Sequence, residues 1–338
     1  MSKKNNEELK IDFVVMWVDG NDVEWIEKKK KYKPEINVDD EKNRYRDWGL
    51  LRYWFRGIEK YAPWANKVYF ITDKQVPDWL NVECQKLRLI DHSDYIDSKY
   101  LPLFNSSAIE CTINKIEGLS ETFVLFNDDF FLIKETKRSD FFRNGLPLDQ
   151  MIENPIRPIK GDGIFSHILL NDMIAVEDEN DKRTFLKRHF FKLLNLKYGF
   201  GVARTLLNLP GKRFSCFYNQ HGPQPFLKNS FDELQAIRRS DFDKTLSNRF
   251  RSKDDITQYA IRYHQMLSGN FMPRCGKFSR LFSISEKNAG AIRRHIEKQK
   301  TKAVCLNDGD RDVDVELVRP KIIEAFEKIL PNKSMFEK

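Results

Sequence analysis

The stretch FVLFNDDFFL, residues 123–132, is the part of the chain around which the rest is organised. Its first four residues are apolar, as in a central strand that is covered on both faces. Asp128 and Asp129 follow, and apolar residues resume at Phe130. Ionised carboxylates beside a core usually need a neutralising partner, and a bound cation is a common one. The stretch therefore predicts a metal or substrate site at a strand end, or else a simple turn, because Asn and Asp also favour turns.

The composition is that of a soluble globular protein with one large domain or two modest ones. The 338 residues include 58 Lys and Arg against 50 Asp and Glu, a net charge of +8. A basic surface suits anionic partners: phosphorylated metabolites, acidic polysaccharide, nucleic acid or anionic lipid.

Five scattered cysteines without a CxxC pair favour a reducing compartment and argue against structural zinc. With no signal-peptide pattern, and no apolar run near the roughly 18 residues of a membrane span, we expect a cytoplasmic protein.

Several other apolar runs end in acidic residues. Residues 11–18 run into Asp19, a second predicted strand ends at Asp73, and a third covers 86–92. A helix with one apolar face is predicted over 51–62. The order β-α-β-β-α-β over 11–132 indicates an α/β sheet, whose ligands would bind beyond the carboxyl ends of the strands. There is no GxGxxG motif, so a dinucleotide site is not indicated.

The second half of the sequence is predicted to be mainly helical. We expect helices over 184–194, 198–207, 254–267, 286–300 and 315–330, and a further one opened by Ser230. His221 lies in a segment with two prolines and a glycine, 219–226, which we expect to be rigid and non-regular. Such segments often carry functional residues, although a lone histidine is more often structural. A second apolar run ends in Asn307-Asp308.

Four blocks of this sequence, in order, resemble the Stealth family of sugar-1-phosphate transferases. The family includes bacterial capsular polysaccharide phosphotransferases and the catalytic subunit of the lysosomal-enzyme N-acetylglucosamine-1-phosphotransferase. The blocks are IDFVVMWVDGNDVEW at 11–25, the long block 44–132, HGPQPF from His221 with RSKDD at 251–255, and CLND at 305–308. The resemblance implies a mixed-sheet α/β core, GT-A-like and Rossmann-like, with helical additions in the C-terminal half.

The resemblance also implies one catalytic domain, 1–338. Its 11–132 half would bind the nucleotide-sugar, 133–215 would be a variable insertion facing the acceptor, and 216–330 would complete the active site. The implied reaction moves a hexose- or N-acetylhexosamine-1-phosphate from a UDP-sugar to a glycan hydroxyl. UMP leaves, and a phosphodiester-linked capsular or extracellular polysaccharide forms. The acceptor would be a polysaccharide or a lipid-linked glycan, so peripheral association with the inner face of the cell membrane stays open. Nucleic acid is not an expected partner.

In the family an acid of the Asn-Asp-Asp segment, the histidine of the third block and the following arginine are functional. They correspond to Asp128 or Asp129, His221 and Arg251. We expect Arg251 to neutralise phosphate charge and His221 to act as general base. Phosphate chemistry favours Mg²⁺ or Mn²⁺ held by carboxylates. We expect Asp128 and Asp129 to point to opposite faces if the strand geometry continues.

The remaining predicted site residues complete the metal shell or bind the donor. The further metal ligands are Asn307 and Asp308. The donor-binding residues are Asp19, Asp22, Trp25, Arg44, Arg46, Asp47, Arg52, Thr72 and Asp73. For Asp22 an alternative is helix capping, and for the arginines with Asp47 it is a structural ion-pair network.

Two other functions are compatible with parts of the pattern. A metal-dependent glycosyltransferase would use the same sheet but release UDP. A basic module that binds nucleic acid or another polyanion would have no turnover and an affinity that falls steeply with salt. The acid-ended strands disfavour that module, as does the lack of a basic stripe interleaved with aromatic residues.

Overall fold

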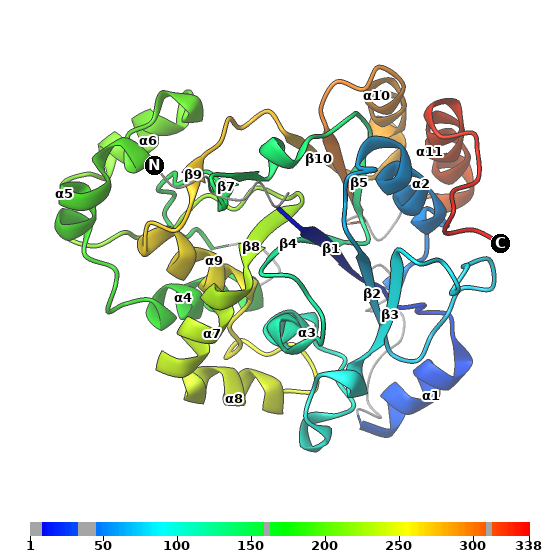
Figure 1. Cartoon of the computed structure of the whole chain (residues 1–338), viewed down its shortest axis with the longest axis horizontal. Coiled ribbons are helices and arrows are strands. Elements are labelled where there is room, and N and C mark those ends of the chain that lie inside the picture. Colours follow the sequence, from blue (N-terminus) through cyan, green and yellow to red (C-terminus); the bar gives the residue numbers. More distant parts are fainter. Residues whose placement is uncertain (1–8, 33–44, 159–162, 309–312) are drawn as a thin grey trace, which may run out of the picture.

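A five-stranded sheet forms the centre of the molecule. The computed structural model describes residues 9–32, 45–158, 163–308 and 313–338. The strand order is β3-β2-β1-β4-β8 (Figure 1). The first four strands are parallel, and β8 runs antiparallel to β4. The bounds are β1 Ile11–Met16, β2 Val68–Thr72, β3 Leu87–Asp91, β4 Thr122–Asn127 and β8 Gln224–Leu227.

Two three-stranded sheets flank the central one. The first has the order β10-β11-β5, and the second β6-β7-β9. Their strands are β5 Phe130–Leu132, β6 Phe142–Arg143, β7 Leu146–Asp149, β9 Met272–Pro273, β10 Ser279–Ser283 and β11 Ala303–Asn307. Parallel and antiparallel pairs occur together, so the predicted mixed-sheet α/β class is confirmed.

Helices cover both faces of the central sheet, as a mainly parallel sheet requires. Phe13 and Val15 of β1 face a core shared with α2, α10 and α11, while Val14 faces a second core shared with α3, α7, α8 and α9 (Figure 1). The helices are α1 Val23–Tyr32, α2 Leu51–Tyr61, α3 Ser106–Glu110, α4 Gly163–Ala175, α5 Lys182–Leu193, α6 Gly201–Leu207, α7 Lys228–Ile237, α8 Arg239–Ser247, α9 Gln258–Leu267, α10 Glu286–Glu297 and α11 Val315–Ile329. Among the described residues, none of these helices combines the length and the apolar character needed to cross a bilayer.

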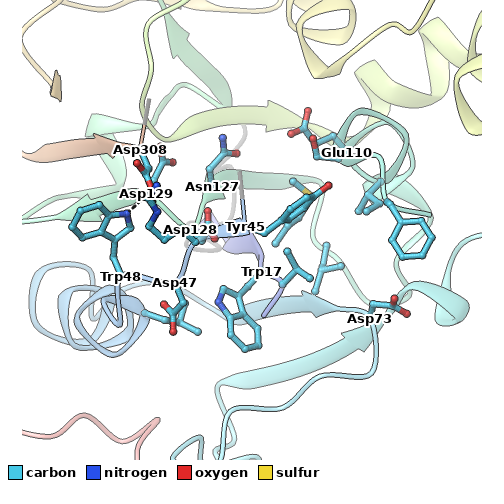
Figure 2. A pocket seen from close by; sticks show the side chains of 18 of the residues that line it. Trp17, Tyr45, Asp47, Trp48, Asp73, Glu110, Asn127, Asp128, Asp129 and Asp308 are labelled. Carbon is cyan, nitrogen blue, oxygen red and sulfur yellow. Dashed lines mark hydrogen bonds and ion pairs between the residues drawn. The ribbon is translucent and has the colours of Figure 1, made fainter. Parts of the chain in front are cut away.

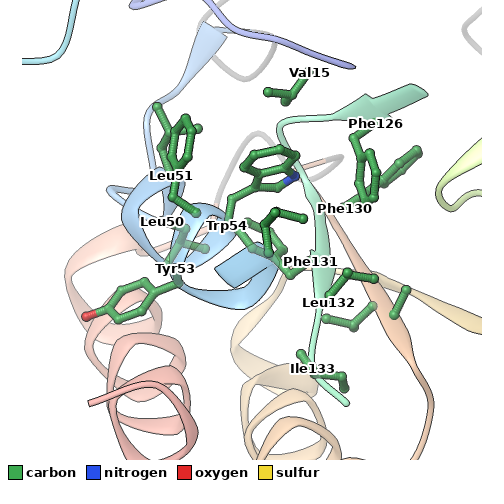
Figure 3. Packing of buried hydrophobic residues seen from close by; sticks show 14 of the residues in the cluster. Val15, Leu50, Leu51, Tyr53, Trp54, Phe126, Phe130, Phe131, Leu132 and Ile133 are labelled. Carbon is green, nitrogen blue, oxygen red and sulfur yellow. The ribbon is translucent and has the colours of Figure 1, made fainter. Parts of the chain in front are cut away.

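Helix α2 fixes the position of the chain that follows β4. Trp54 is fully buried and lies edge-on against Phe126, with ring centroids 5.4 Å apart (Figure 3). One turn later, a Cβ atom at Gly57 would stand only 2.8 Å from the carbonyl oxygen of Leu132. Glycine therefore allows α2 to lie directly against β5, as its predicted apolar face requires.

The stretch 123–132 begins with the predicted buried strand, but the sequence did not predict that its last residues form a separate strand. Strand β4 ends at Asn127, Asp128 and Asp129 form a turn, and β5 then pairs with β11 in another sheet. The prediction of a non-regular segment over 219–226 is wrong in part, because β8 starts at Gln224 and includes Pro225. Proline is tolerated there because β8 is an edge strand. Helix α3 is short, and a separate 3-10 turn over Ile113–Lys115 follows it.

Candidate active site

A cleft of about 590 Å³ opens beyond the carboxyl ends of β1, β2 and β4. Its wall includes Trp17 after β1, Asp73 after β2, and Asn127 with Asp128 at the end of β4 (Figure 2). Ligands of open α/β sheets bind at this edge because the strand ends and their loops converge there. The carboxyl-end site predicted from the acid-ended strands thus coincides with the large cleft of the described structure.

Asp128 and Asp129 both line this cleft. They occupy a turn rather than a continuing strand, so the condition for the expected placement on opposite faces is not met. The Asp128 side chain reaches the solvent of the cleft. Asp129 is more enclosed: its Oδ2 accepts a hydrogen bond from Cys305 Sγ at 3.2 Å, and its Oδ1 is buried without a hydrogen-bond partner in the described structure.

The surroundings of the two acids favour their protonated forms. Loss of hydration, and then the negative charge of Asp129, raise the pKa of Asp128 to about 7. Loss of hydration also raises the pKa of Asp129 to about 6, although the hydrogen bond from Cys305 lowers it in part. Two crowded carboxyl groups of this kind gain from a nearby positive charge. They are therefore candidates for binding a cation.

Strand β11 brings Asn307 and Asp308 to the same place. Cys305 is paired with Phe130, and the Leu306 amide donates to the Asp129 carbonyl oxygen at 3.0 Å. The next two residues line the cleft. Asp308 Oδ2 accepts a hydrogen bond from Trp48 Nε1 at 2.9 Å and lies 3.3 Å from Arg46 Nε. Figure 2 shows Asp308, Asp129 and Trp48 gathered at one end of the cleft.

The residues present fit a hard divalent cation. In the part of the chain that the structure describes, no three His, Cys, Asp or Glu side chains form a ready-made metal cage. Mg²⁺ does not need one, because it is often held by one or two carboxylates and completes its shell with water and substrate phosphate. The buried Oδ1 of Asp129 and the raised pKa values of both acids match that mode of binding.

Arginines lie at two ends of the cleft, and aromatic rings form much of its wall. Arg251 Nη2 donates to Ser106 Oγ at 2.8 Å, and its charge acts on Glu110. Arg46 lies at the other end, beside Asp308. The cleft is also lined by the aromatic side chains of Trp17, Trp25, Tyr45, Trp48, Phe104 and Phe131. The site thus offers positive charge for phosphate groups and flat apolar surface for a base or a sugar.

The wall of the cleft beneath Tyr45 depends on Gly20. A Cβ atom at Gly20 would stand 2.4 Å from both Tyr45 Cβ and the Tyr45 carbonyl oxygen. Tyr45 in turn packs on Trp25 at 5.0 Å between ring centroids. The glycine that the sequence places after β1 is therefore needed for close packing of this aromatic wall.

His221 lies at the same edge of the sheet, but it is not among the residues that line the cleft. Gln224 of β8 is paired with Leu125 of β4, so the chain three residues earlier lies level with the turn after β4. The His221 carbonyl oxygen accepts a hydrogen bond from Ser279 Oγ at 3.0 Å. The histidine side chain itself is exposed. The structure thus places His221 near the acids without enclosing it.

The predicted donor-binding residues separate into two groups. Trp25, Arg46, Asp47 and Asp73 line the cleft. Four others do not line it: Asp19, Asp22, Arg52 and Thr72. Arg44 lies outside the described residues.

The second group has other structural partners. Asp22 caps α1 by accepting hydrogen bonds from the Glu24 and Trp25 amides at 2.9 and 3.2 Å. Asp19 accepts a hydrogen bond from the Asn21 amide, also at 2.9 Å. The Arg52 guanidinium lies over the Trp79 ring. Direct donor contact by these residues stays a prediction, since helix capping or packing accounts for their positions.

Glu110 is a candidate functional residue that the sequence did not indicate. It lies at the C-terminal end of α3 and lines the cleft. Loss of hydration raises its pKa to about 7, although Arg251 lowers it in part. The local sequence, SSAIE, is that of an ordinary helix. Only the packing of α3 against the segment that carries Arg251 brings this acid into the site.

Comparisons with known proteins agree on one family. The models of Stealth conserved regions 1 and 2 match residues 9–36 and 44–148. Capsular polysaccharide phosphotransferase WcwK of Streptococcus pneumoniae is 41% identical over 338 residues, with 99% of each chain covered. Exopolysaccharide phosphotransferase cps2G of Lactiplantibacillus plantarum is 38% identical, with 97% of this chain and 96% of that protein covered.

Similarity to solved structures is much weaker. A structure of the galactosyltransferase LgtC in complex with donor and acceptor sugar analogues covers 93% of this chain and 95% of its own. The sequence identity is 10% and the TM-score is 0.39. A likeness of that size carries no argument about function.

Proposed function

This chain belongs to the Stealth family and is a transferase, and from that premise we propose that it transfers sugar-1-phosphate to a glycan. The donor would be a UDP-sugar, and the acceptor a hydroxyl of a polysaccharide or a lipid-linked glycan. The hydroxyl oxygen attacks the phosphorus next to the sugar, the bond from that phosphorus to the UMP oxygen breaks, and UMP leaves. The product is a phosphodiester. Relatives named for capsular and exopolysaccharide phosphotransfer support this choice of acceptor.

The observation that carries the proposal is the acid turn between two cationic ends of one cleft. Asp128 and Asp129 lie at the end of β4, with Arg46 and Arg251 among the same lining residues. Phosphoryl transfer needs little covalent help from a protein. It mainly needs positioning and the stabilisation of charge on the transferred group and the leaving group. This cleft would meet both needs for a bound diphosphate, because its two ends would position the phosphates and its cationic groups would stabilise their charge.

We assign the divalent cation, Mg²⁺ or Mn²⁺, to Asp128 and Asp129, with Asn307 and Asp308 as additional ligands. When bound, such an ion neutralises negative charge on the diphosphate oxygens. Asp128 and Asp129 would hold such an ion at the turn after β4. Asp308 has a second task, since its ion pair with Arg46 keeps that guanidinium at the cleft.

Arg251 is assigned to the transferred phosphate. Its hydrogen bond to Ser106 Oγ fixes one edge of the guanidinium and so limits its orientation. A guanidinium can donate two parallel hydrogen bonds to phosphate oxygens, which gives geometric selectivity as well as charge. Trp17, Trp25 and Tyr45 provide ring surfaces for the uracil.

The acceptor hydroxyl must lose a proton during the attack. We assign this role to His221, which lies at the acidic edge of the sheet. Loss of hydration lowers the pKa of its ring below the ordinary value, so the imidazole is neutral at physiological pH and can accept a proton. A positioned general base contributes roughly 10²–10⁴ in rate. We place the reaction on the cytoplasmic side of the membrane, where UDP-sugars would be the available donors.

The nucleotide product tests the reaction. Purified protein is incubated with Mg²⁺, a soluble glycan acceptor and a panel of UDP-sugars, and the nucleotides are separated by chromatography. We expect UMP in proportion to product, and a phosphodiester resonance in the phosphorus NMR spectrum of the glycan. Asp129→Asn protein is the matched control and should give neither. Release of UDP with a phosphate-free glycan would assign the cleft to an ordinary glycosyltransferase instead.

A further inference from the structure

The segment 182–213, which contains α5 and α6, exposes an unusual amount of apolar surface. The most exposed large apolar side chains of the described structure are Phe200 at 97%, Leu196 at 92%, Leu207 at 83% and Phe191 at 80%. All four fall within 17 residues of one another in this segment. Exposed clusters of this kind are rare on soluble proteins unless they contact a partner or a membrane.

The same segment accounts for the positive charge of the protein. Its 32 residues contain nine of the 58 Lys and Arg and none of the 50 Asp and Glu, so the rest of the chain is close to neutral. Seven of the nine are exposed, and in the described structure none of these seven lies within 4 Å of a carboxylate. They are Arg183, Lys187, Arg188, Lys197, Arg204, Lys212 and Arg213. Arg183 and Arg213 interact electrostatically with Asp181, which directly precedes the segment. The segment itself thus combines exposed apolar side chains with an excess of exposed basic ones.

The segment 182–213, which carries the exposed apolar side chains, is held firmly to the rest of the protein. Lys182 at the start of α5 lies 2.8 Å from Glu153 Oε2, and both side chains are buried. Lys182 Nζ also donates to the Asn208 carbonyl oxygen at the end of α6, which closes the segment on itself. Between the helices, Tyr198 Oη donates to the Lys192 carbonyl oxygen at 2.6 Å. Phe185, Leu193 and Tyr198 face the core. The exposed rings are therefore held outward by the fold.

We propose that the segment 182–213 docks the protein on the surface of an anionic lipid bilayer. Phe191, Leu196 and Phe200 would enter the boundary between headgroups and acyl chains, while the surrounding cations meet the lipid phosphates. Each Lys or Arg close to an anionic leaflet adds attraction, and the apolar side chains add burial that a soluble polyanion could not provide. A second copy of this chain is disfavoured as the occupant because the two basic surfaces would repel.

The position of the segment in the molecule suits this role. Figure 1 shows α5 and α6 together at one end of the molecule, opposite α10 and α11. The cleft lies over the central sheet, at the ends of β1, β2 and β4. Docking by α5 and α6 therefore leaves the described cleft residues uncovered. The inference does not depend on the reaction proposed above, because its test measures binding and not turnover.

Vesicle flotation of the full chain tests the proposal. The probes are vesicles of phosphatidylcholine alone, and of phosphatidylcholine with about one-third phosphatidylglycerol. We expect binding to the anionic vesicles only, weakened by high salt. The apolar variant Phe191→Ser/Leu196→Ser/Phe200→Ser should bind at least ~30-fold more weakly. The charge variant Lys187→Gln/Arg188→Gln/Lys197→Gln should also bind at least ~30-fold more weakly, at low salt.

The matched control removes three exposed cations from the opposite end of the molecule, Lys287→Gln/Lys298→Gln/Lys300→Gln. It should bind like the unaltered protein. Unfolding midpoints within a degree or two of the unaltered protein would show that the variants fold. No binding by the unaltered protein, equal binding to neutral vesicles, or equal losses in the control would overturn the proposal. So would full retention of binding by the apolar variant, which would indicate a site for soluble polyanions.

Discussion

Two titratable side chains, one in the cleft and one beside it at the same edge of the sheet, compete for the role of general base. Glu110 lines the cleft, and its pKa of about 7 would let it accept a proton near neutral pH. His221 is the residue implied by the family resemblance, and it lies level with the acid turn without lining the cleft. Glu110 is also close enough to Arg251 for their charges to interact. Glu110 therefore has an alternative role, which is to orient the arginine.

His221→Ala and Glu110→Gln separate the two assignments. We expect His221→Ala to lower kcat by about 10²–10⁴ while the KM for the UDP-sugar changes little, because the histidine acts on the acceptor. Glu110→Gln keeps the shape of the side chain and should lower kcat by less than about tenfold. Initial rates at saturating acceptor give both values. The reverse pattern, with a steep loss in Glu110→Gln and unchanged turnover in His221→Ala, would transfer the role of base to Glu110.

The cleft residues also show what a sequence can say about single side chains. The Asp128-Asp129 pair is indicated by its contrast with the apolar residues on both sides, and the structure places both acids in the cleft. Asp22 had two interpretations, and its hydrogen bonds with the start of α1 favour capping. Glu110 had no local indication, because its role depends on a contact with a segment about 140 residues away. Residue types predict chemistry, whereas distant packing selects which residues take part.

Among the secondary-structure elements, β7 and α9 are joined by a buried ion pair. Arg262 of α9 donates two hydrogen bonds to Asp149 of β7, from Nε and Nη2, each at 2.7 Å. Both side chains are about 2% exposed. Arg262 Nη1 also donates to Asn219 Oδ1 at 2.6 Å, and Gln224 Nε2 donates to Asp149 Oδ2 at 3.0 Å. The network thus fixes both ends of the segment that carries His221.

Asp149→Ala should destabilise the protein strongly. The substitution leaves the Arg262 charge buried without a counter-ion, which typically costs about 3–5 kcal/mol of the free energy of unfolding. Urea denaturation followed by circular dichroism measures the change. Lys328→Ala is the control: Lys328 lies 3.3 Å from Glu297 on the surface, where such pairs contribute less than about 1 kcal/mol. A loss for Asp149→Ala as small as that of the control would show that the network does not hold these elements together.

Most strands of the central sheet were predicted, including β3 at one edge, whereas β8, the two-residue strands and the helices α4 and α8 were not. The apolar face of α2 recurs with the helical period, and β1, β2 and β4 are continuous apolar runs; the structure confirms all four. Strand β8 was missed because Pro225 disfavours a strand anywhere except at a sheet edge. Strands β6 and β9 have two residues each, too few to show alternation. The sequence does not reveal which strand will lie at an edge, since that depends on the pairing of distant segments.

For the molecule as a whole, the position of the charge matters more than its sum. The net charge of +8 was interpreted as a mildly basic surface in general, yet 182–213 alone supplies nine positive residues. That count is visible in the sequence. The exposure of Phe191, Leu196 and Phe200 is not visible in the sequence, because the same apolar residues would also suit a buried helical hairpin. Only the fold shows that charge and apolar surface lie together and face outward.

The cleft collects residues from Met16 to Asp308, so a ligand bound there should stabilise the entire chain. We expect UMP with Mg²⁺ to raise the unfolding midpoint by several degrees, since a ligand at about 100 times its Kd adds about 2.7 kcal/mol. The Mg²⁺-dependent part should grow with pH through about 6 to 7, because the pKa values of Asp129 and Asp128 lie there and protonated carboxyl groups bind the cation poorly.

When a chelator removes the cation, the contribution of Asp128 and Asp129 to stability should decrease with rising pH, whereas the Mg²⁺-dependent stabilisation increases. Their pKa values are raised above the ordinary 3.8 in the folded protein, so the folded state holds protons that the unfolded chain has lost. Their contribution to stability therefore falls as pH rises through that window. Thermal scans with and without Mg²⁺, from about pH 5.5 to about pH 8, give the difference that isolates the site. In Asp129→Asn protein the Mg²⁺-dependent increase should largely disappear. An increase that is independent of pH, or that survives this substitution, would place the cation elsewhere in the protein.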